Sequence, residues 1–191
     1  KSTRNTRGRI VSAAWKLFYE QGYEDTTVEE IIELSGTSKG SFYHYFDGKD
    51  ALLSTLSSLF DEKYEELTGL LTPEMTAMEQ LLFLNRELFH MIEDSISLDL
   101  LARLYSTQLT TNGEKHLLDH NRTYYKLLRK IIAKGQSEGQ LSSRSNVNEM
   151  VKLYALCERA LLYDWCLCAG EYALTEYSAK VLPGFLSSFL P

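Results

Sequence analysis

Residues 26–46 carry the side chains with the clearest capacity for molecular recognition. The segment reads TTVEEIIELSGTSKGSFYHYF: a helix of under ten residues with capping residues at its start, a turn containing Gly36 and a second short helix. Two short helices joined by such a turn form the outline of a helix-turn-helix, whose second helix enters the major groove of DNA. The same outline fits a plain helical hairpin equally well.

The second short helix would present small, hydroxyl and basic side chains on its leading face. Small and hydroxyl residues at a helix start suit phosphate, because exposed N–H groups and the positive end of the helix dipole favour anions. Tyr43 and His44 can reach phosphates or base edges, and Lys39 can donate to O6 and N7 of guanine. The residues expected on this face are Thr37, Ser38, Lys39, Gly40, Ser41, Tyr43, His44 and Tyr45.

Basic residues also precede the segment. Arg4, Arg7 and Arg9 lie before or within the first turn of the opening helix, which beside a helix-turn-helix predicts an arm that meets phosphate or the minor groove. The chain carries a net charge of −6, which taken as an average argues against DNA. Most of that charge lies after residue 50, however, and residues 1–9 hold four basic side chains and no acidic one. The average therefore hides a small basic face.

The elements that must position these residues are helical almost throughout. Apolar residues recur at three- and four-residue spacings, only three prolines are present, and no alternating strand-like run is found. Turn and capping signals divide the chain into about nine helices, one of them running from Lys49 toward Thr68. We therefore predict an all-α fold, with a three-helix head over residues 1–48 and a larger helical domain over residues 49–191.

Several short motifs in the head occur together in one known family. The first helix ends in Phe18-x-x-x-Gly22-Tyr23, and the next opens with Thr26-Thr27-Val28-x-x-Ile31. The run Gly40-Ser41-Phe42-Tyr43-x-Tyr45-Phe46 follows the turn, and Lys49 precedes Leu52-Leu53. With these motifs, roughly residues 1–60 resemble the N-terminal domain of TetR-family transcriptional regulators. The rest of the chain matches that family only in length, helical character and turn placement.

The resemblance implies a role for individual residues of the head. It implies a phosphate contact from Thr27 and base or groove contacts from Ser38, Lys39, Gly40 and Ser41. It implies that Tyr43, His44 and Lys49 hold the DNA backbone. Lys39 and Gly40 occupy positions that vary within the family, so the motif predicts DNA binding without predicting the operator. With Arg4 and Thr37, these residues form the predicted DNA-binding set.

The C-terminal helices predict a second copy of the chain as a partner. Residues 146–169 are apolar on nearly every side, and the last helix shows a similar excess. A helix that is apolar all round must be covered all round, and two helices from each of two protomers would form a four-helix interface. The family resemblance implies the same homodimer. The predicted interface residues are Tyr154, Leu161, Trp165, Tyr177, Val181 and Phe185.

The middle helices carry aromatic and mixed polar residues of the kind that line small-molecule pockets. Such a stripe also fits an ordinary core. We predict a pocket for an effector of unknown identity, with no cofactor, from Tyr64, Phe83, His90, Arg103, Tyr105, Tyr125, Tyr154 and Trp165.

These features predict a cytoplasmic, homodimeric, ligand-responsive repressor that binds a pseudo-palindromic operator in double-stranded DNA and is released by a small molecule. We expect no enzyme, because common hydrolase and redox motifs are missing. Three cysteines within twelve residues indicate a reducing compartment rather than disulfides. Two alternatives stay open: a helical adaptor for another protein, and a metal-binding protein using His116 and His120, although two histidines alone are too few for zinc.

Overall fold

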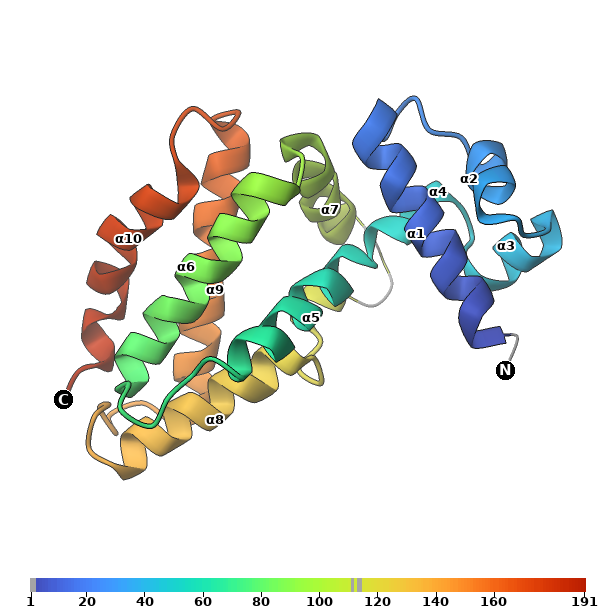
Figure 1. Ribbon diagram of the computed structural model, residues 1–191. Coiled ribbons are helices and arrows are strands. Elements are labelled where there is room, and N and C mark those ends of the chain that lie inside the picture. The colour runs from blue at the N-terminus through green and yellow to red at the C-terminus, as the bar shows by residue number, and fades with distance from the viewer. Residues whose placement is uncertain (1–2, 111, 113–114) are drawn as a thin grey trace. The chain divides into compact units, whose positions relative to one another are not determined.

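The computed structural model describes residues 3–110, 112 and 115–191, with side chains from Thr6 onward (Figure 1). Within these residues the chain forms ten α-helices, two short 3₁₀ helices and no strand, which confirms the all-α prediction. The α-helices are α1 (Thr3–Gln21), α2 (Val28–Ser35), α3 (Lys39–Tyr45), α4 (Lys49–Leu53), α5 (Leu56–Thr68), α6 (Ala77–Ser95), α7 (Leu98–Thr110), α8 (Thr123–Ser137), α9 (Val147–Leu167) and α10 (Leu174–Phe185). The 3₁₀ helices are η1 (His116–Leu118) and η2 (Leu186–Phe189).

The helices group into two compact units. Unit 1 combines residues 1–58 with residues 99–116, and unit 2 combines residues 59–98 with residues 117–191. Unit 1 thus reaches beyond residue 48, where the sequence suggested that the head ends, and includes α4 and most of α7. Unit 2 contains most of α5 together with α6, α8, α9 and α10.

The head of unit 1 is built around the packing of α1, α2 and α3 (Figure 1). Ile10 and Phe18 of α1, Ile31 of α2 and Phe42 of α3 are all almost completely buried. Burying each such side chain contributes about 1.5–3 kcal/mol relative to leaving it exposed. This small core holds α3 against the other two helices and leaves the opposite face of α3 in solvent.

The turn between α2 and α3 ends one helix and starts the next. Gly36 adopts the left-handed conformation at φ 60°, and its N–H donates to the carbonyl of Glu33. A residue with a side chain is strained in that conformation, so glycine suits this position. Ser38 then caps α3, because its hydroxyl accepts from the N–H of Ser41. The predicted helix-turn-helix geometry is confirmed.

The continuous helix expected from Lys49 toward Thr68 is wrong. The structure breaks it into α4 and α5 at Ser54 and Thr55. The Ser54 hydroxyl donates to the carbonyl of Ala51, and the Thr55 hydroxyl donates to that of Leu52 at 2.6 Å. Serine and threonine side chains compete in this way for the carbonyls of a helix. The indole N–H of Trp15 on α1 then donates to the Thr55 hydroxyl, which fixes the break in place.

In unit 2, α6 packs against both α10 and α8, and α9 contacts α8 and α10 as well (Figure 1). The backbone of α8 at Gly135 lies close to neighbouring side chains. A Cβ atom at this position would lie 2.5 Å from Cβ of Ala77 and 2.8 Å from the Leu141 side chain. Only glycine therefore fits at Gly135.

Replacing Gly135 by alanine is expected to destabilise the protein by about 1–3 kcal/mol, as forced overpacking usually does. Urea unfolding followed by circular dichroism measures this loss. The matched control is Gly8→Ala on α1, where an added Cβ meets no atom within 4 Å. A control variant at least as stable as wild type, beside a clear loss at Gly135, supports the close packing. Equal stabilities for both variants would contradict it.

Candidate DNA-binding and effector sites

The leading face of α3 is open to solvent. Lys39, Gly40, Tyr43 and His44 are exposed, and Tyr43 keeps 46% of its surface accessible. Ser38 is also exposed, whereas Thr37 and Ser41 are partly covered. The structure thus brings the predicted contact residues of α3 together on one accessible surface, backed by Phe42 in the core.

Thr27 begins α2 on the same head. Its hydroxyl accepts from the N–H of Glu30, and the Glu30 carboxylate accepts from the N–H of Thr27 at 2.8 Å. This reciprocal capping box satisfies two N–H groups at the helix start. Thr27 remains exposed at the start of α2, but its hydroxyl donates to the Glu30 carboxylate at 2.9 Å, so a phosphate would have to replace this acceptor.

The basic residues of α1 lie close to these elements. Arg7 places its guanidinium 5.4 Å from the ring centre of Phe46, just after α3. A guanidinium nitrogen of Arg9 lies about 4 Å from the position that a Cβ would take at Gly36, in the turn. Both arginines are exposed. The side chain of Arg4, also predicted to meet DNA, lies outside the described residues.

The side chain of Lys49, predicted to contact the DNA backbone, forms hydrogen bonds within the head. Its ammonium donates to the carbonyls of Tyr23, Glu24 and Thr26 at 2.7, 3.2 and 2.9 Å. It also lies 4.3 Å from the ring centre of Tyr23. An ammonium has three N–H donors, so all three have acceptors within the head. Lys49 thereby holds the loop between α1 and α2.

Arg103 of α7 also packs against Tyr23 in unit 1. Its guanidinium lies 4.9 Å from the ring centre of Tyr23 and forms ion pairs with Glu24 at 2.6 Å and Asp99 at 2.9 Å. The Tyr23 hydroxyl donates to Asp50, and burial followed by this hydrogen bond raises the pKa of Tyr23. Arg103 was predicted to line a ligand pocket. The structure places it against the head instead.

The interior of unit 2 contains an unusual polar group, the carboxylate of Glu158 on α9. Glu158 is 4% exposed, and its two oxygens accept from the Tyr124 hydroxyl at 2.6 Å and the Asn85 amide at 2.7 Å. Ser178 on α10 donates to the Asn85 carbonyl oxygen at 2.6 Å. Burial is the largest influence on the carboxyl and raises the pKa of Glu158 to about 7.

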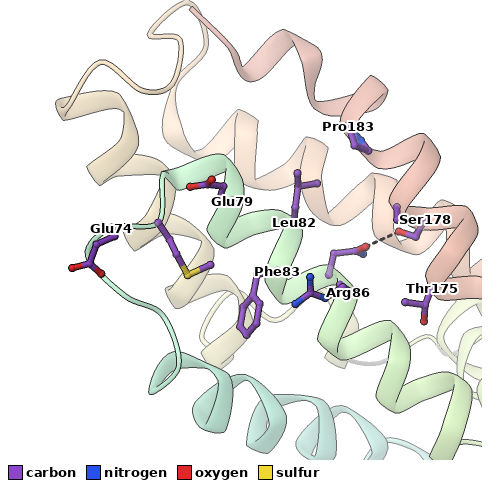
Figure 2. Close-up of a pocket in the computed structure, with 11 residues that line it drawn as sticks. Glu74, Glu79, Leu82, Phe83, Arg86, Thr175, Ser178 and Pro183 are labelled. Atoms are coloured by element: carbon purple, nitrogen blue, oxygen red, sulfur yellow. Dashed lines mark hydrogen bonds between the residues drawn. The ribbon is translucent and has the colours of Figure 1, made fainter.

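A cleft of about 570 Å³ lies between α6 and α10 on the outside of this network (Figure 2). Its volume falls within the range of about 300–1,000 Å³ that small-molecule sites occupy. Ser178 and Asn85 both line the cleft, and the dashed line at Ser178 in Figure 2 marks the hydrogen bond between them. The lining residues are Glu74, Met75, Glu79, Leu82, Phe83, Asn85, Arg86, Thr175, Ser178, Ala179 and Pro183.

The structure brings only some of the predicted pocket residues together. Tyr64, Tyr125 and Tyr154 are buried inside unit 2, and Phe83 lines the cleft. The remaining predicted residues lie elsewhere. His90 is exposed and lies 3.3 Å from Asp94, Tyr105 belongs to α7, and the Trp165 indole donates to the Tyr172 carbonyl at 2.9 Å.

Sequence reasoning missed Glu158, Asn85 and Ser178 as site residues. A signal for Glu158 was present, because it is one of few charged residues in an otherwise apolar segment. Nothing local marks Asn85 or Ser178, which meet Glu158 only through tertiary packing.

The predicted interface residues divide between the interior and the surface. Tyr154, Leu161 and Trp165 are buried within the protomer, at 6% exposure or less. Tyr177 and Phe185 of α10 are exposed at 42% and 53%. Val181 is partly covered and lines a groove between α9 and α10 together with Tyr177 and Phe185.

Three exposed apolar residues of α9 extend this surface: Leu156, Tyr163 and Leu167, at 52%, 51% and 67% exposure. Their spacings of seven and four residues place them on one stripe of the helix, which Ala160 continues. We call Leu156, Ala160, Tyr163 and Leu167, with Tyr177, Val181 and Phe185, the apolar face.

The structure offers no support for metal binding or for a reactive cysteine among the described residues. Among the described residues, no group of three or more histidines, cysteines or acidic residues is placed to hold a metal ion. Burial raises the pKa of Cys157, Cys166 and Cys168, which disfavours the reactive thiolate form. No helix in the described part of the chain is long and apolar enough to cross a membrane.

An exposed recognition helix on a three-helix head defines a helix-turn-helix protein, and comparison with known proteins agrees. The family model described as "Bacterial regulatory proteins, tetR family" matches residues 10–56. The chain is 36% identical over 62 residues to the HTH-type transcriptional regulator QacR of Staphylococcus aureus, covering 32% of this chain and 33% of QacR. It is 23% identical over 178 residues to the fatty acid metabolism regulator protein of Bacillus subtilis, covering 91% and 90% of the two chains.

The fold of the whole chain is also shared. The crystal structure of Thermus thermophilus FadR, a TetR-family repressor in complex with lauroyl-CoA, has a TM-score of 0.72 and 24% identity, over 97% of this chain and 95% of that one. The first curated relatives match over only 22–33% of their own length. Residues 10–56 thus match the model of the TetR family of bacterial regulatory proteins, and the whole chain shares the fold of a solved TetR-family regulator.

Proposed function

We propose that this protein is a homodimeric transcriptional repressor that binds an operator with two-fold symmetry and leaves it when a small molecule occupies unit 2. The observation that carries the proposal is the exposed face of α3, where Lys39, Gly40, Tyr43 and His44 stand on a capped helix with a buried back. A helix presented in this way suits the major groove. The repressor acts by occupying DNA and performs no catalysis.

The proposed dimer forms through the apolar face. A two-fold dimer places its recognition helices one helical turn of DNA or more apart, so each reads one half-site. Large apolar side chains such as Leu167 and Phe185, exposed together on neighbouring helices, are typical of interfaces. A second copy covering both helices would bury them.

An effector is supported by the cleft between α6 and α10 and by the polar interior behind it. A ligand lowers operator occupancy only if it binds more tightly to the arrangement that does not fit DNA. A structural neighbour, Thermus thermophilus FadR, was solved with lauroyl-CoA bound, which supports a ligand-responsive regulator here.

Replacing Lys39 by alanine is expected to change which operator is preferred. Loss of a bidentate donor to guanine costs about 1–3 kcal/mol at one base position and relaxes specificity there. Gel-shift titrations on inverted repeats that differ at single positions measure this preference. His44→Ala, at an exposed position expected to meet the backbone, is the matched control and should weaken all sequences about equally. The same uniform loss from both variants would contradict the assigned roles.

Replacing Leu167 by glutamate is expected to weaken the dimer. Loss of one buried leucine, about 1.5–3 kcal/mol, corresponds to at least a tenfold rise in the dimer dissociation constant. Sedimentation velocity over a concentration series measures it. Leu109→Glu is the control, since Leu109 is 75% exposed on α7 and lies outside the apolar face. A Leu167 variant that dimerises as well as wild type would contradict this interface.

A further inference from the structure

The Glu158 carboxylate has no charged partner at hydrogen-bond distance. Its hydrogen bonds come from neutral groups: the Tyr124 hydroxyl at 2.6 Å, the Asn85 amide at 2.7 Å, and the Tyr154 hydroxyl. Among the described residues no lysine, arginine or histidine forms an ion pair with it. The neighbouring cation, Arg159, instead donates to the Tyr125 hydroxyl at 3.2 Å. The charge of Arg159 favours the ionised form of Glu158, but burial outweighs it. A buried carboxylate without an ion-pair partner is costly, so the interior favours a cation that can reach it.

A second group in this interior also lacks a partner. The Tyr64 hydroxyl is buried, and it is the one buried side-chain polar atom without a hydrogen bond in the described part of the chain. The Tyr64 ring packs 5.0 Å from that of Tyr124, whose hydroxyl bonds Glu158. An unsatisfied buried hydroxyl costs about 1–3 kcal/mol, which a ligand or water recovers. The Glu158 carboxylate and the Tyr64 hydroxyl, which Tyr124 connects, could therefore each form a further hydrogen bond to a ligand.

The cleft between α6 and α10 gives access to this cluster. Its lining includes Asn85 and Ser178, joined by the hydrogen bond drawn in Figure 2. The amide of the same Asn85 reaches Glu158, so a single side chain separates the cleft from the carboxylate. Leu82 and Phe83 supply apolar and aromatic surface in the cleft lining.

The charges of the cleft lining also suit a cation. Glu74 and Glu79 contribute negative charge, and the lining contains one cation, Arg86. Arg86 is already neutralised by Glu87, at 3.0 Å, and lies 5.4 Å from the ring centre of Phe83. Arg86 thereby shows that a cation can lie over this aromatic ring.

We propose that the effector of this regulator is a compact organic cation with an aromatic or apolar body, whose ammonium replaces the Asn85 amide as donor to Glu158 while its body occupies the cleft beside Leu82 and Phe83. This inference rests on the proposed function, since it names the class of effector for the same unit. A fatty acyl chain fits this site poorly, because it would set methylene groups against a buried carboxylate. The multiple negative charges of coenzyme A would face Glu74 and Glu79.

The test compares benzylammonium with benzyl alcohol, which share one skeleton and differ in charge. Isothermal titration of the purified full chain at pH 8 should give at least about tenfold tighter binding of benzylammonium, or about 1.4 kcal/mol. In Glu158→Gln the ratio should fall below about twofold, because the affinity for benzylammonium falls. Glu176→Gln, at an exposed carboxylate on α10, is the control and should keep the wild-type ratio.

The wild-type protein provides a second measurement that does not depend on the folding of a variant. Because burial raises the pKa of Glu158 to about 7, the preference for benzylammonium should shrink when the titration is repeated at pH 5.5, about where the carboxyl is mostly protonated. The other groups around Glu158 keep their charge over this range, since the pKa values of the tyrosines and of the thiol are raised and arginine stays protonated. These groups are Tyr64, Tyr124, Tyr154, Cys157 and Arg159.

Equal affinity for benzylammonium and benzyl alcohol in the wild type would overturn the inference. So would a charge preference that survives Glu158→Gln, or tighter binding of lauroyl-CoA than of benzylammonium. DNA binding without ligand is measured separately by gel shift. Failure to bind any DNA would contradict the proposed function, whereas normal DNA binding without a charge preference would contradict only the choice of effector.

Discussion

Replacing Glu158 by glutamine is expected to remove a loss of stability that the wild-type protein shows as pH rises from about 5 to about 8. Burial raises the pKa of this carboxyl from 4.5 to about 7 in the folded state. Between these two values the unfolded chain gives up the proton while the folded chain keeps it. Stability therefore falls with rising pH, and the full loss is present above the folded pKa.

The size of this effect is on the order of 3 kcal/mol, because each unit of pKa shift corresponds to about 1.4 kcal/mol. Urea unfolding at half-unit steps of pH measures it in wild type and in Glu158→Gln. Glutamine keeps the shape and one of the two acceptor oxygens but cannot ionise. The gap between the two proteins should open as pH rises, with the variant more stable at pH 8.

Glu176→Gln, on the surface of α10, should follow the wild-type curve. If wild type and Glu158→Gln show parallel stability curves over the whole range, Glu158 does not titrate as the structure indicates. That result would contradict the claim that unit 2 buries an ionisable carboxylate without an ion-pair partner.

Replacing Lys49 by methionine is expected to destabilise unit 1 by about 2–3 kcal/mol, because the loss of charge-assisted hydrogen bonds to half-buried acceptors is expensive. Three carbonyls, those of Tyr23, Glu24 and Thr26, lose their donor. Methionine keeps an apolar stem beside the Tyr23 ring, so the packing changes little. Thermal or urea unfolding measures the loss, and Lys16→Met, at an exposed position on α1, is the control.

The same variant separates two roles for Lys49 in DNA binding. If its ammonium holds the loop between α1 and α2, Lys49→Met weakens DNA binding and leaves the dependence of affinity on salt unchanged. If the ammonium instead binds a phosphate, the slope of log K against log salt falls by about 1. Titrations at four salt concentrations below the unfolding temperature distinguish the two. A lowered slope with unchanged stability would contradict the internal role.

The head could be predicted from sequence in detail because its determinants are local. Capping by Thr27, the left-handed turn at Gly36 and the cap at Ser38 each depend on residues three or four positions apart. The exposed face of α3 follows from the same helical spacing, with Phe42 on its buried side. The internal hydrogen bonds of Lys49 could not be predicted, because its acceptors lie 23 to 26 residues earlier in the chain.

The proposed effector site could not be predicted in this way, because the contacts that form it join distant helices. Glu158 meets Asn85 across 73 residues, and Asn85 meets Ser178 across 93. The apolar face shows the same limit. The sequence of a helix that is apolar on nearly every side, such as α9, does not reveal which side its own protomer covers. The predicted interface therefore included Tyr154 and Trp165, which the protomer buries, and did not include Leu156 and Tyr163, which are exposed.

The measurement that tests the central claim most directly is selection of bound duplexes from a random DNA library, followed by light scattering of the protein with the winning sequence. We expect enrichment of an inverted repeat, two protomers on each duplex, and loss of enrichment when Lys39 and Tyr43 are both replaced by alanine. Recovery of no common sequence by the wild-type protein, or equal recovery by the double variant, would contradict the assignment of α3 as the helix that reads DNA.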